Sequence, residues 1–175
     1  MIRQSQLSIL ITREEIEQTV VRLAHEVESD YQGKHPLLVG VLKGSFVFMA
    51  DLIRHLDMPL ELDFIKVCSY CAGQESPGIV RLMQDLGSPV EGRDVLVIED
   101  IVDTGSTISF VLDHLRKGEP GSLKLCALTD KPSRRRVRVS IDYVGLTVPD
   151  AFIVGYGLDC DERFRNLPDI CVLES

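Results

Sequence analysis

The stretch VLVIEDIVDTGST, residues 95–107, decides the fold of this chain. Its first residues are apolar and mostly β-branched, which predicts a strand buried on both faces. The strand leads into two carboxylates, Glu99 and Asp100, then into a short polar loop at 103–107 from which a helix starts. In this geometry the loop amides and hydroxyls, with the helix N-terminus behind them, converge on one phosphate. Gly105 allows the backbone to approach that phosphate closely.

The two carboxylates need a neutral or positive group between themselves and a phosphate, because like charges repel. Glu99 and Asp100 therefore predict sugar hydroxyls, a divalent metal ion or both. Mg²⁺ is the natural ion, since one or two carboxylates, waters and substrate phosphate oxygens hold it. The alternative is an ordinary strand-to-helix turn with an aspartate cap, but strand, acid pair, loop and helix all agree here. The sequence has no G-x-x-x-x-G-K-[ST], which excludes a Walker A loop.

The flanking sequence alternates between helical and strand-like patterns. Thr12 followed by Glu15 is a capping-box pattern with apolar residues at helical spacing behind it, so we expect a helix over about 13–29. Further helices are expected over 46–56 and from the polar loop to Gly118, where the helix should stop. Short apolar runs predict strands at 36–42, 61–70, 94–102, 122–130, 141–145 and 152–158. Strands that alternate with helices indicate an α/β fold with a largely parallel sheet.

Length and charge narrow the classes of function. The 175 residues suit one domain, spanning 1–175. The net charge of -8 argues against a nucleic-acid-binding protein, which needs many cationic contacts, but it allows a local site for an anionic small molecule. No apolar run reaches the length of a membrane span and the N-terminus lacks a signal-peptide pattern, so we expect a cytoplasmic protein without membrane contact.

The five cysteines are odd in number and unevenly spaced. This pattern favours reduced thiols over a disulfide framework. Cys68 and Cys71 form one C-x-x-C pair, but no second pair follows to complete a structural zinc site.

Several stretches, taken together, resemble one known family. VLVIEDIVDTGST resembles the phosphoribosyl pyrophosphate motif of type I phosphoribosyltransferases. Within that family, VGVLKGSFVFMADL resembles the pyrophosphate loop of the hypoxanthine-guanine enzymes, SYCAGQESPG their flexible catalytic loop, and DKPSRR, PDAFIVGYGLD and ERFRNLP their purine-binding end. The matches come in family order and cover nearly the whole chain. The resemblance implies the type I phosphoribosyltransferase fold, a mainly parallel twisted sheet flanked by helices with a small hood built from the chain ends.

The resemblance also implies roles at the phosphate loop. The residues that hold the 5-phosphate would be Asp103, Thr104, Gly105, Ser106 and Thr107. Glu99 and Asp100 would meet the ribose hydroxyls and a Mg²⁺ ion. Asp103 matches the position that takes a proton from purine N7, a general-base role; the alternative is that it only shapes the loop.

Pyrophosphate would lie on the other side of the ribose. Lys43 and Gly44 match the family's pyrophosphate loop, in which a cis peptide joins Leu42 to Lys43. Arg165 matches an arginine that contacts pyrophosphate. Asp159 matches an acid of the purine-binding end that faces the metal and pyrophosphate.

The base would be recognised by residues near the C-terminus. Lys131 matches a lysine that donates to the purine 6-oxo group; a cation cannot accept from the 6-amino group of adenine, so 6-oxopurines are favoured. The alternative is that Lys131 belongs to a solvated basic run, which fits its neighbours Arg134, Arg136 and Arg138 better. Phe152 matches the aromatic residue that stacks on the base and Ile153 the one whose backbone contacts its edge, although periodicity alone would place both in the core.

Ser69 and Tyr70 match the lid that closes over the reaction centre and excludes water. The function expected is thus Mg²⁺-dependent transfer from phosphoribosyl pyrophosphate to hypoxanthine or guanine, by a homodimer or homotetramer. Two alternatives stay open. One is a regulator that keeps the phosphoribosyl pyrophosphate fold to bind nucleic acid; the other is an enzyme acting on another base, of which xanthine fits better than a pyrimidine.

Overall fold

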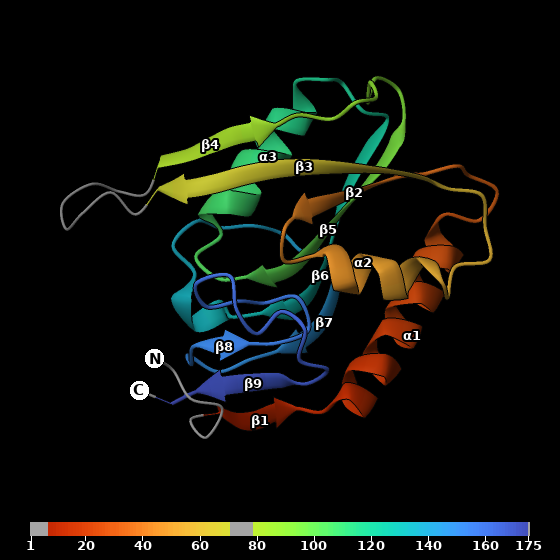
Figure 1. The fold of residues 1–175 in the computed structure, drawn as a ribbon. Coiled ribbons are helices and arrows are strands. Elements are labelled where there is room, and N and C mark those ends of the chain that lie inside the picture. The colour runs from red at the N-terminus through yellow and green to blue at the C-terminus, as the bar shows by residue number, and fades with distance from the viewer. Residues whose placement is uncertain (1–6, 71–78, 175) are drawn as a thin grey trace.

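The computed structural model describes residues 7–70 and 79–174, which form two sheets and three α-helices (Figure 1). In chain order the elements are β1 (Leu7–Ile11), α1 (Arg13–Asp30), β2 (Leu37–Leu42), α2 (Phe46–Ile53), β3 (Glu61–Tyr70), β4 (Ile79–Gln84), β5 (Asp94–Val102), α3 (Ser106–Arg116), β6 (Ser122–Asp130), a 3-10 turn η2 (Pro132–Arg134), β7 (Tyr143–Thr147), β8 (Ile153–Val154) and β9 (Ile170–Leu173).

The larger sheet has six strands in the order β4-β3-β2-β5-β6-β7. All neighbours are parallel except β3 and β4, which are antiparallel. Helices α1 and α2 cover one face and α3 covers the other (Figure 1). The predicted α/β fold with a largely parallel sheet is confirmed.

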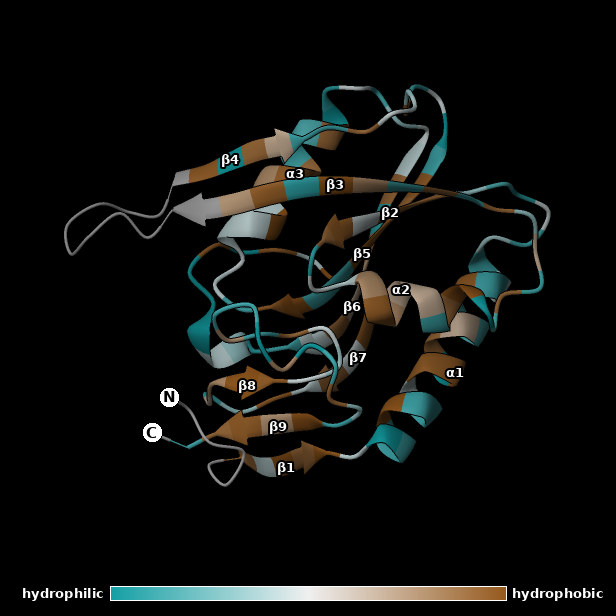
Figure 2. Ribbon diagram, viewed as in Figure 1, coloured by the Kyte–Doolittle hydropathy of each residue, from teal (hydrophilic) through white to brown (hydrophobic). Residues whose placement is uncertain are grey.

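The central strands contribute to a hydrophobic core on each face. In β5, Leu96 and Ile98 pack against α1 and α2, while Val95 and Val97 pack against α3. Successive side chains of a strand point to opposite faces, so a strand covered on both sides is apolar throughout. In Figure 2 brown prevails along the inner strands, with paler and teal segments between.

The order of the strands places a crevice between β2 and β5. The chain continues from β2 to β3 on one side and from β5 to β6 on the other, so the direction of winding reverses between these two neighbours. In parallel α/β sheets, ligands bind outside the carboxyl ends of the strands at such a reversal. The loops that follow β2 and β5 are those with the pyrophosphate and phosphate motifs.

The smaller sheet is antiparallel, in the order β1-β9-β8. It joins the first described strand to the last two, beside the two chain ends (Figure 1). This is the hood of chain ends that the family resemblance implied. Apolar-run length did not reveal β1, β4 or β9 in the sequence.

The helix predictions hold with small shifts. Thr12 and Glu15 form the predicted capping box, and α1 extends one residue past the predicted end. Helix α2 ends at Ile53, before the predicted residue 56, because Arg54 and His55 donate to carbonyls three residues back and tighten the last turn. None of the helices in the described part of the chain is long and apolar enough to span a membrane.

Helix α3 ends at Arg116 with Lys117 as its C-cap, so the chain leaves the helix at Gly118 as predicted. The left-handed residue of this turn is the next one, Glu119 (φ 53°). Gly118 also allows close packing, because a Cβ there would lie 2.4 Å from Val90 Cγ2. The strand expected over 152–158 is reduced to β8, since three consecutive positive φ angles turn the chain just after it.

Candidate active site

The loop after β5 encloses a cavity of about 190 Å³. Its lining consists of Glu99, Asp100, Ile101, Val102, Asp103, Thr104, Gly105, Thr107 and Ile108. Gly105 has φ 85° and caps α3, where an L side chain would be strained and would meet Val137 O at 2.4 Å. Ser106 begins the helix, and its amide donates weakly to Thr104 Oγ1 at 3.3 Å. The strand, loop and helix N-terminus are therefore arranged as the sequence predicted for an anion site.

Glu99 and Asp100 are both buried at the wall of this cavity. Burial raises the pKa of Glu99 well above its usual value, and the neighbouring Asp100 charge raises it further. Burial likewise raises the pKa of Asp100, although Ile101 N donates to its carboxylate at 2.9 Å. Glu99 Oε2 is buried without a hydrogen-bond partner among the described residues. Two adjacent buried carboxylates with unused oxygen lone pairs could serve as ligands of a cation.

This pair fits Mg²⁺, which takes one or two protein carboxylates and completes its shell with water and substrate oxygens. Within residues 7–70 and 79–174, no three Asp, Glu, His or Cys side chains gather closely enough to hold a metal by themselves. Asp159 therefore does not join Glu99 and Asp100 in one protein shell.

The loop after β2 lies directly against the acid pair. The Leu42–Lys43 peptide is cis, as the family resemblance implied. A Cβ on Gly44 would lie 1.7 Å from Asp100 Oδ2, so only glycine allows this approach. Lys43 reaches outward and pairs with Glu162 at 3.0 Å.

Arg165 approaches the same loop from the C-terminal segment. It donates to Gly157 O at 2.7 Å and pairs with Asp159 at 2.7 Å. Its Nε is buried without a hydrogen-bond partner in the described structure, which leaves a donor available to an anion. Asp159 also accepts from Glu162 N at 2.9 Å. Asp159 thus positions Arg165 in this state of the protein.

Asp103 lies between two cations. Its carboxylate is 3.3 Å from Arg134 Nε and 3.9 Å from Lys131 Nζ. Asp103 Oδ1 accepts no hydrogen bond from the residues described. Arg134 is exposed, as expected for a solvated charge, and it also lies 3.6 Å from Asp150.

Lys131 is 5% exposed and therefore is not part of a solvated basic face. Its ammonium donates to Ala151 O at 2.7 Å, which holds it beside the next residue, Phe152. Phe152 is 56% exposed, and Ile153 is 6% exposed in the core. Of the two, only Ile153 is the core residue that periodicity suggested. The exposed ring, the lysine and Asp103 are brought to one edge of the site.

Ser69 and Tyr70 end β3, opposite Val80 and Ile79 of β4. Their side chains, and residues 71–78 with Cys71, lie outside the described residues. The lid assignment stays a prediction.

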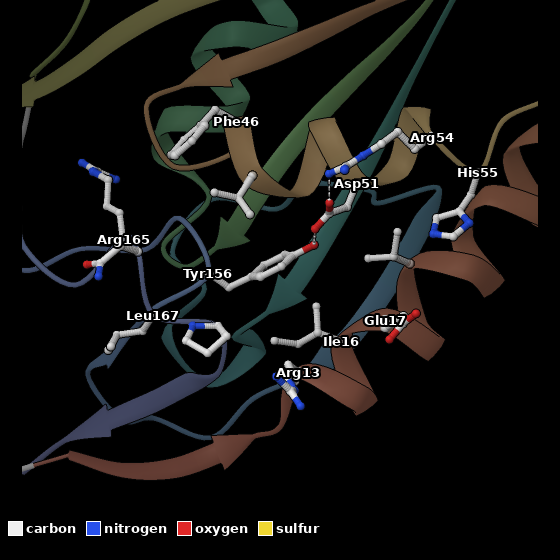
Figure 3. A pocket seen from close by; sticks show the side chains of 14 residues that line it. Arg13, Ile16, Glu17, Phe46, Asp51, Arg54, His55, Tyr156, Arg165 and Leu167 are labelled. Carbon is white, nitrogen blue, oxygen red and sulfur yellow. Dashed lines mark hydrogen bonds and ion pairs between the residues drawn. The ribbon is translucent and has the colours of Figure 1, made fainter.

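A second, larger cavity of about 710 Å³ lies between α1, α2 and residues 165–168 (Figure 3). Tyr156 reaches across it and donates from Oη to Asp51 at 2.5 Å, and Asp51 also pairs with Arg54. Arg165 is the one residue it shares with the candidate site. This cavity is larger than the one beside the phosphate loop, but neither the buried acid pair nor the phosphate loop is part of its lining.

Sequence reasoning missed one residue beside the phosphate loop. Arg135 donates through Nε to Asp103 O and through Nη2 to Val102 O, both at 3.1 Å. The signal was hidden because the run KPSRRRVR has no periodicity that separates a buried arginine from exposed ones.

Comparisons with known proteins agree with this geometry. Residues 8–161 match the family described as phosphoribosyl transferase domain. The chain is 51% identical to the hypoxanthine-guanine phosphoribosyltransferase of Bacillus subtilis, over 95% of this chain and 92% of that protein. Among solved structures, a hypoxanthine phosphoribosyltransferase from Staphylococcus aureus matches with a TM-score of 0.92 at 45% identity, covering 97% of this chain and 93% of that one. A hypoxanthine-guanine phosphoribosyltransferase from Bacillus anthracis matches with a TM-score of 0.89, also at 45% identity, over 94% and 97%.

Proposed function

The chain belongs to the phosphoribosyltransferase family, and from this we propose that it is a hypoxanthine-guanine phosphoribosyltransferase of purine salvage. It transfers the 5-phosphoribosyl group of phosphoribosyl pyrophosphate to the base and releases pyrophosphate. The observation that carries this proposal is the meeting of a phosphate loop, a buried acid pair and a buried lysine at one crevice.

In the reaction the bond from ribose C1′ to pyrophosphate breaks and a bond from C1′ to purine N9 forms. The amides and hydroxyls of residues 103–107 hold the 5-phosphate, and Lys43, Gly44 and Arg165 face the departing pyrophosphate. As N9 bonds to C1′, Asp103 takes the proton from N7. Its carboxylate suits that role because Oδ1 accepts no hydrogen bond in the described structure.

The purine is selected by Lys131 and held by Phe152. The Lys131 ammonium can only donate, so it pairs with the 6-oxo group of hypoxanthine or guanine and leaves the adenine amino group without an acceptor. Phe152 offers its exposed face for stacking, and the backbone of Ile153 lies next to it at the base edge. Xanthine differs from these bases at position 2, which Lys131 does not read.

Mg²⁺ is the proposed cofactor, held by Glu99 and Asp100 together with substrate oxygens. When bound, it would offset part of the negative charge of the acid pair and of the departing pyrophosphate. Asp159 is proposed to lie on the pyrophosphate side, where it already pairs with Arg165 and accepts from Glu162 N. It would therefore contact the metal ion only when bound substrate completes the coordination shell of that ion.

We also propose a subcellular location and an oligomeric state for the protein. Cys68, Cys126, Cys160 and Cys171 are free thiols, which supports a reducing compartment and hence the cytoplasm. The family resemblance supports a homodimer or homotetramer, which sedimentation would distinguish. Neither nucleic acid nor a membrane is a proposed partner.

The proposal is tested by following nucleotide formation from hypoxanthine, phosphoribosyl pyrophosphate and Mg²⁺. Asp103→Asn keeps the shape of the loop but removes the proton acceptor, so kcat should fall by roughly 10²–10⁴-fold. Asp113→Asn, on the exposed side of α3, is the matched control and should leave kcat unchanged. Wild-type protein that binds phosphoribosyl pyrophosphate but forms no nucleotide would instead support a regulator.

A further inference from the structure

Three consecutive carbonyls of the phosphate loop point to the same segment of chain. Val102 O accepts from Lys131 N at 3.0 Å and from Arg135 Nη2 at 3.1 Å. Asp103 O accepts from Arg135 Nε at 3.1 Å. Thr104 O accepts from the amides of Arg136 and Val137 at 2.9 and 3.0 Å. The loop backbone is therefore held from one side by residues 131–137.

The N–H groups of the same peptide units point away from residues 131–137. In a planar trans peptide the C=O of one residue and the N–H of the next point in opposite directions. Fixing the carbonyls of residues 102–104 thus directs the amides of residues 103–105 away from the 131–137 segment. Residues 103–105 are among those that line the cavity beside the acid pair.

Arg135 is suited to this task by its shape and by its surroundings. Its planar guanidinium places two donors in a fixed fork, which a lysine ammonium on a flexible stem cannot reproduce. The side chain is 18% exposed, and its charge is balanced by an ion pair with Asp130, the last residue of β6. Asp130 precedes Lys131, so the guanidinium also joins the phosphate loop to the base-selecting lysine.

We propose that Arg135 is a positioning residue that aims the loop amides at the 5-phosphate. The inference rests on the proposed function and adds a residue to it. Arg135 itself makes no contact with substrate in this arrangement. Its loss should weaken the phosphoribosyl end of the site while the pyrophosphate end, built from Lys43, Gly44 and Arg165, is unaffected.

The test compares two ligands by calorimetry in the presence of Mg²⁺. Ribose 5-phosphate reports on the phosphate loop and inorganic pyrophosphate reports on the other end. Arg135→Gln removes the fork and its charge, whereas Arg135→Lys keeps the charge. Arg138→Gln is the matched control, because it removes a charge from the same basic run at an exposed side chain. Thermal melting verifies that each variant folds.

We expect Arg135→Gln to weaken ribose 5-phosphate binding at least tenfold, and Arg135→Lys several-fold, with pyrophosphate binding changed less than twofold. Arg138→Gln should bind both ligands as the wild type does. If Arg135→Gln does not fold, Arg135→Lys gives the same comparison. The inference is overturned by wild-type affinity in Arg135→Lys, by equal losses for both ligands, or by an equal loss in Arg138→Gln. Wild-type protein that fails to bind ribose 5-phosphate would contradict the proposed function instead.

Discussion

At the scale of single residues, Gly44 is the point where the loop after β2 lies against Asp100 of β5. A Cβ at this position would lie 1.7 Å from Asp100 Oδ2 and 2.4 Å from Asp100 Cγ. Asp100 is buried and its carboxylate accepts from Ile101 N at 2.9 Å, so moving this side chain aside would break that hydrogen bond.

Gly44→Ala should therefore displace either the pyrophosphate loop or Asp100. A displacement near 1 Å at a reacting centre costs about 10²-fold in rate, so kcat/KM should fall by at least roughly that factor. Gly87→Ala is the control, since its nearest neighbour, Asp63 Oδ2, would be 3.8 Å from the new Cβ. Steady-state kinetics of both variants check the prediction, and near-normal kcat/KM in Gly44→Ala would show that the loops can separate.

In the basic run after β6, the sequence predicted the environment of some residues but not of others. Lys131 was separated correctly from its neighbours, because its place in the purine motif differs from theirs. Arg135 was not, because the 3-10 turn at Pro132–Arg134 folds the run back over the phosphate loop. Such a turn depends on tertiary contacts, which the spacing of apolar and charged residues along the chain does not predict.

At the scale of elements, β8 is where the periodic reading was least accurate. The seven-residue run 152–158 is apolar enough for a strand, but Gly155, Tyr156 and Gly157 all have positive φ. The chain turns there so that Tyr156 can donate to Asp51 of α2. Phe152 lies just before this short strand, and its side chain is exposed.

Truncation of Phe152 should therefore weaken substrate binding, whereas truncation of the neighbouring Ile153 should lower folding stability. Phe152→Ala removes an exposed stacking face worth about 1–3 kcal/mol, so the KM for hypoxanthine should rise roughly tenfold or more with little change in melting temperature. Ile153→Ala opens a cavity in the core and should cost about 2–5 kcal/mol of folding stability. Kinetics and urea unfolding of both variants separate the two effects; a large stability loss in Phe152→Ala would place its ring in the core.

The far end of the sheet is joined to α1 by Asp30. Its carboxylate accepts from Lys124 Nζ at 2.6 Å and from Tyr143 Oη at 2.7 Å. The hydrogen bond from Lys124, followed by that from Tyr143, lowers the pKa of Asp30 below its usual value. A lowered pKa means that the folded protein binds this proton less tightly than the unfolded chain, so the contact stabilises above about pH 4 and is lost as pH falls through the folded-state pKa.

Asp30→Asn should accordingly be less stable than the wild type at pH 7, and the difference should shrink as pH falls below about 4. Urea unfolding at pH 7 and pH 3 measures both values. Glu91→Gln, at an exposed carboxylate, is the control. A stability difference that stays constant with pH would mean that the Asp30 charge contributes nothing.

At the scale of the whole molecule, the apolar runs located the inner strands because those strands are covered on both faces. Leu38 and Val39 of β2, for example, belong to opposite cores. Strands with one open face or little length, such as β4 and β9, lack that signal. The reversal between β2 and β5, which creates the crevice, comes from strand order and could be expected only from the family resemblance.

The central claim is that this crevice joins a 6-oxopurine to a phosphoribosyl group. The most direct measurement is kcat/KM of the wild type with phosphoribosyl pyrophosphate, Mg²⁺ and, in separate reactions, hypoxanthine, guanine, xanthine, adenine and uracil. A buried donor that must be paired rejects a base lacking the acceptor by about 10⁴-fold or more, so hypoxanthine or guanine should exceed adenine by that order. Turnover of adenine or uracil within tenfold of hypoxanthine would contradict the account.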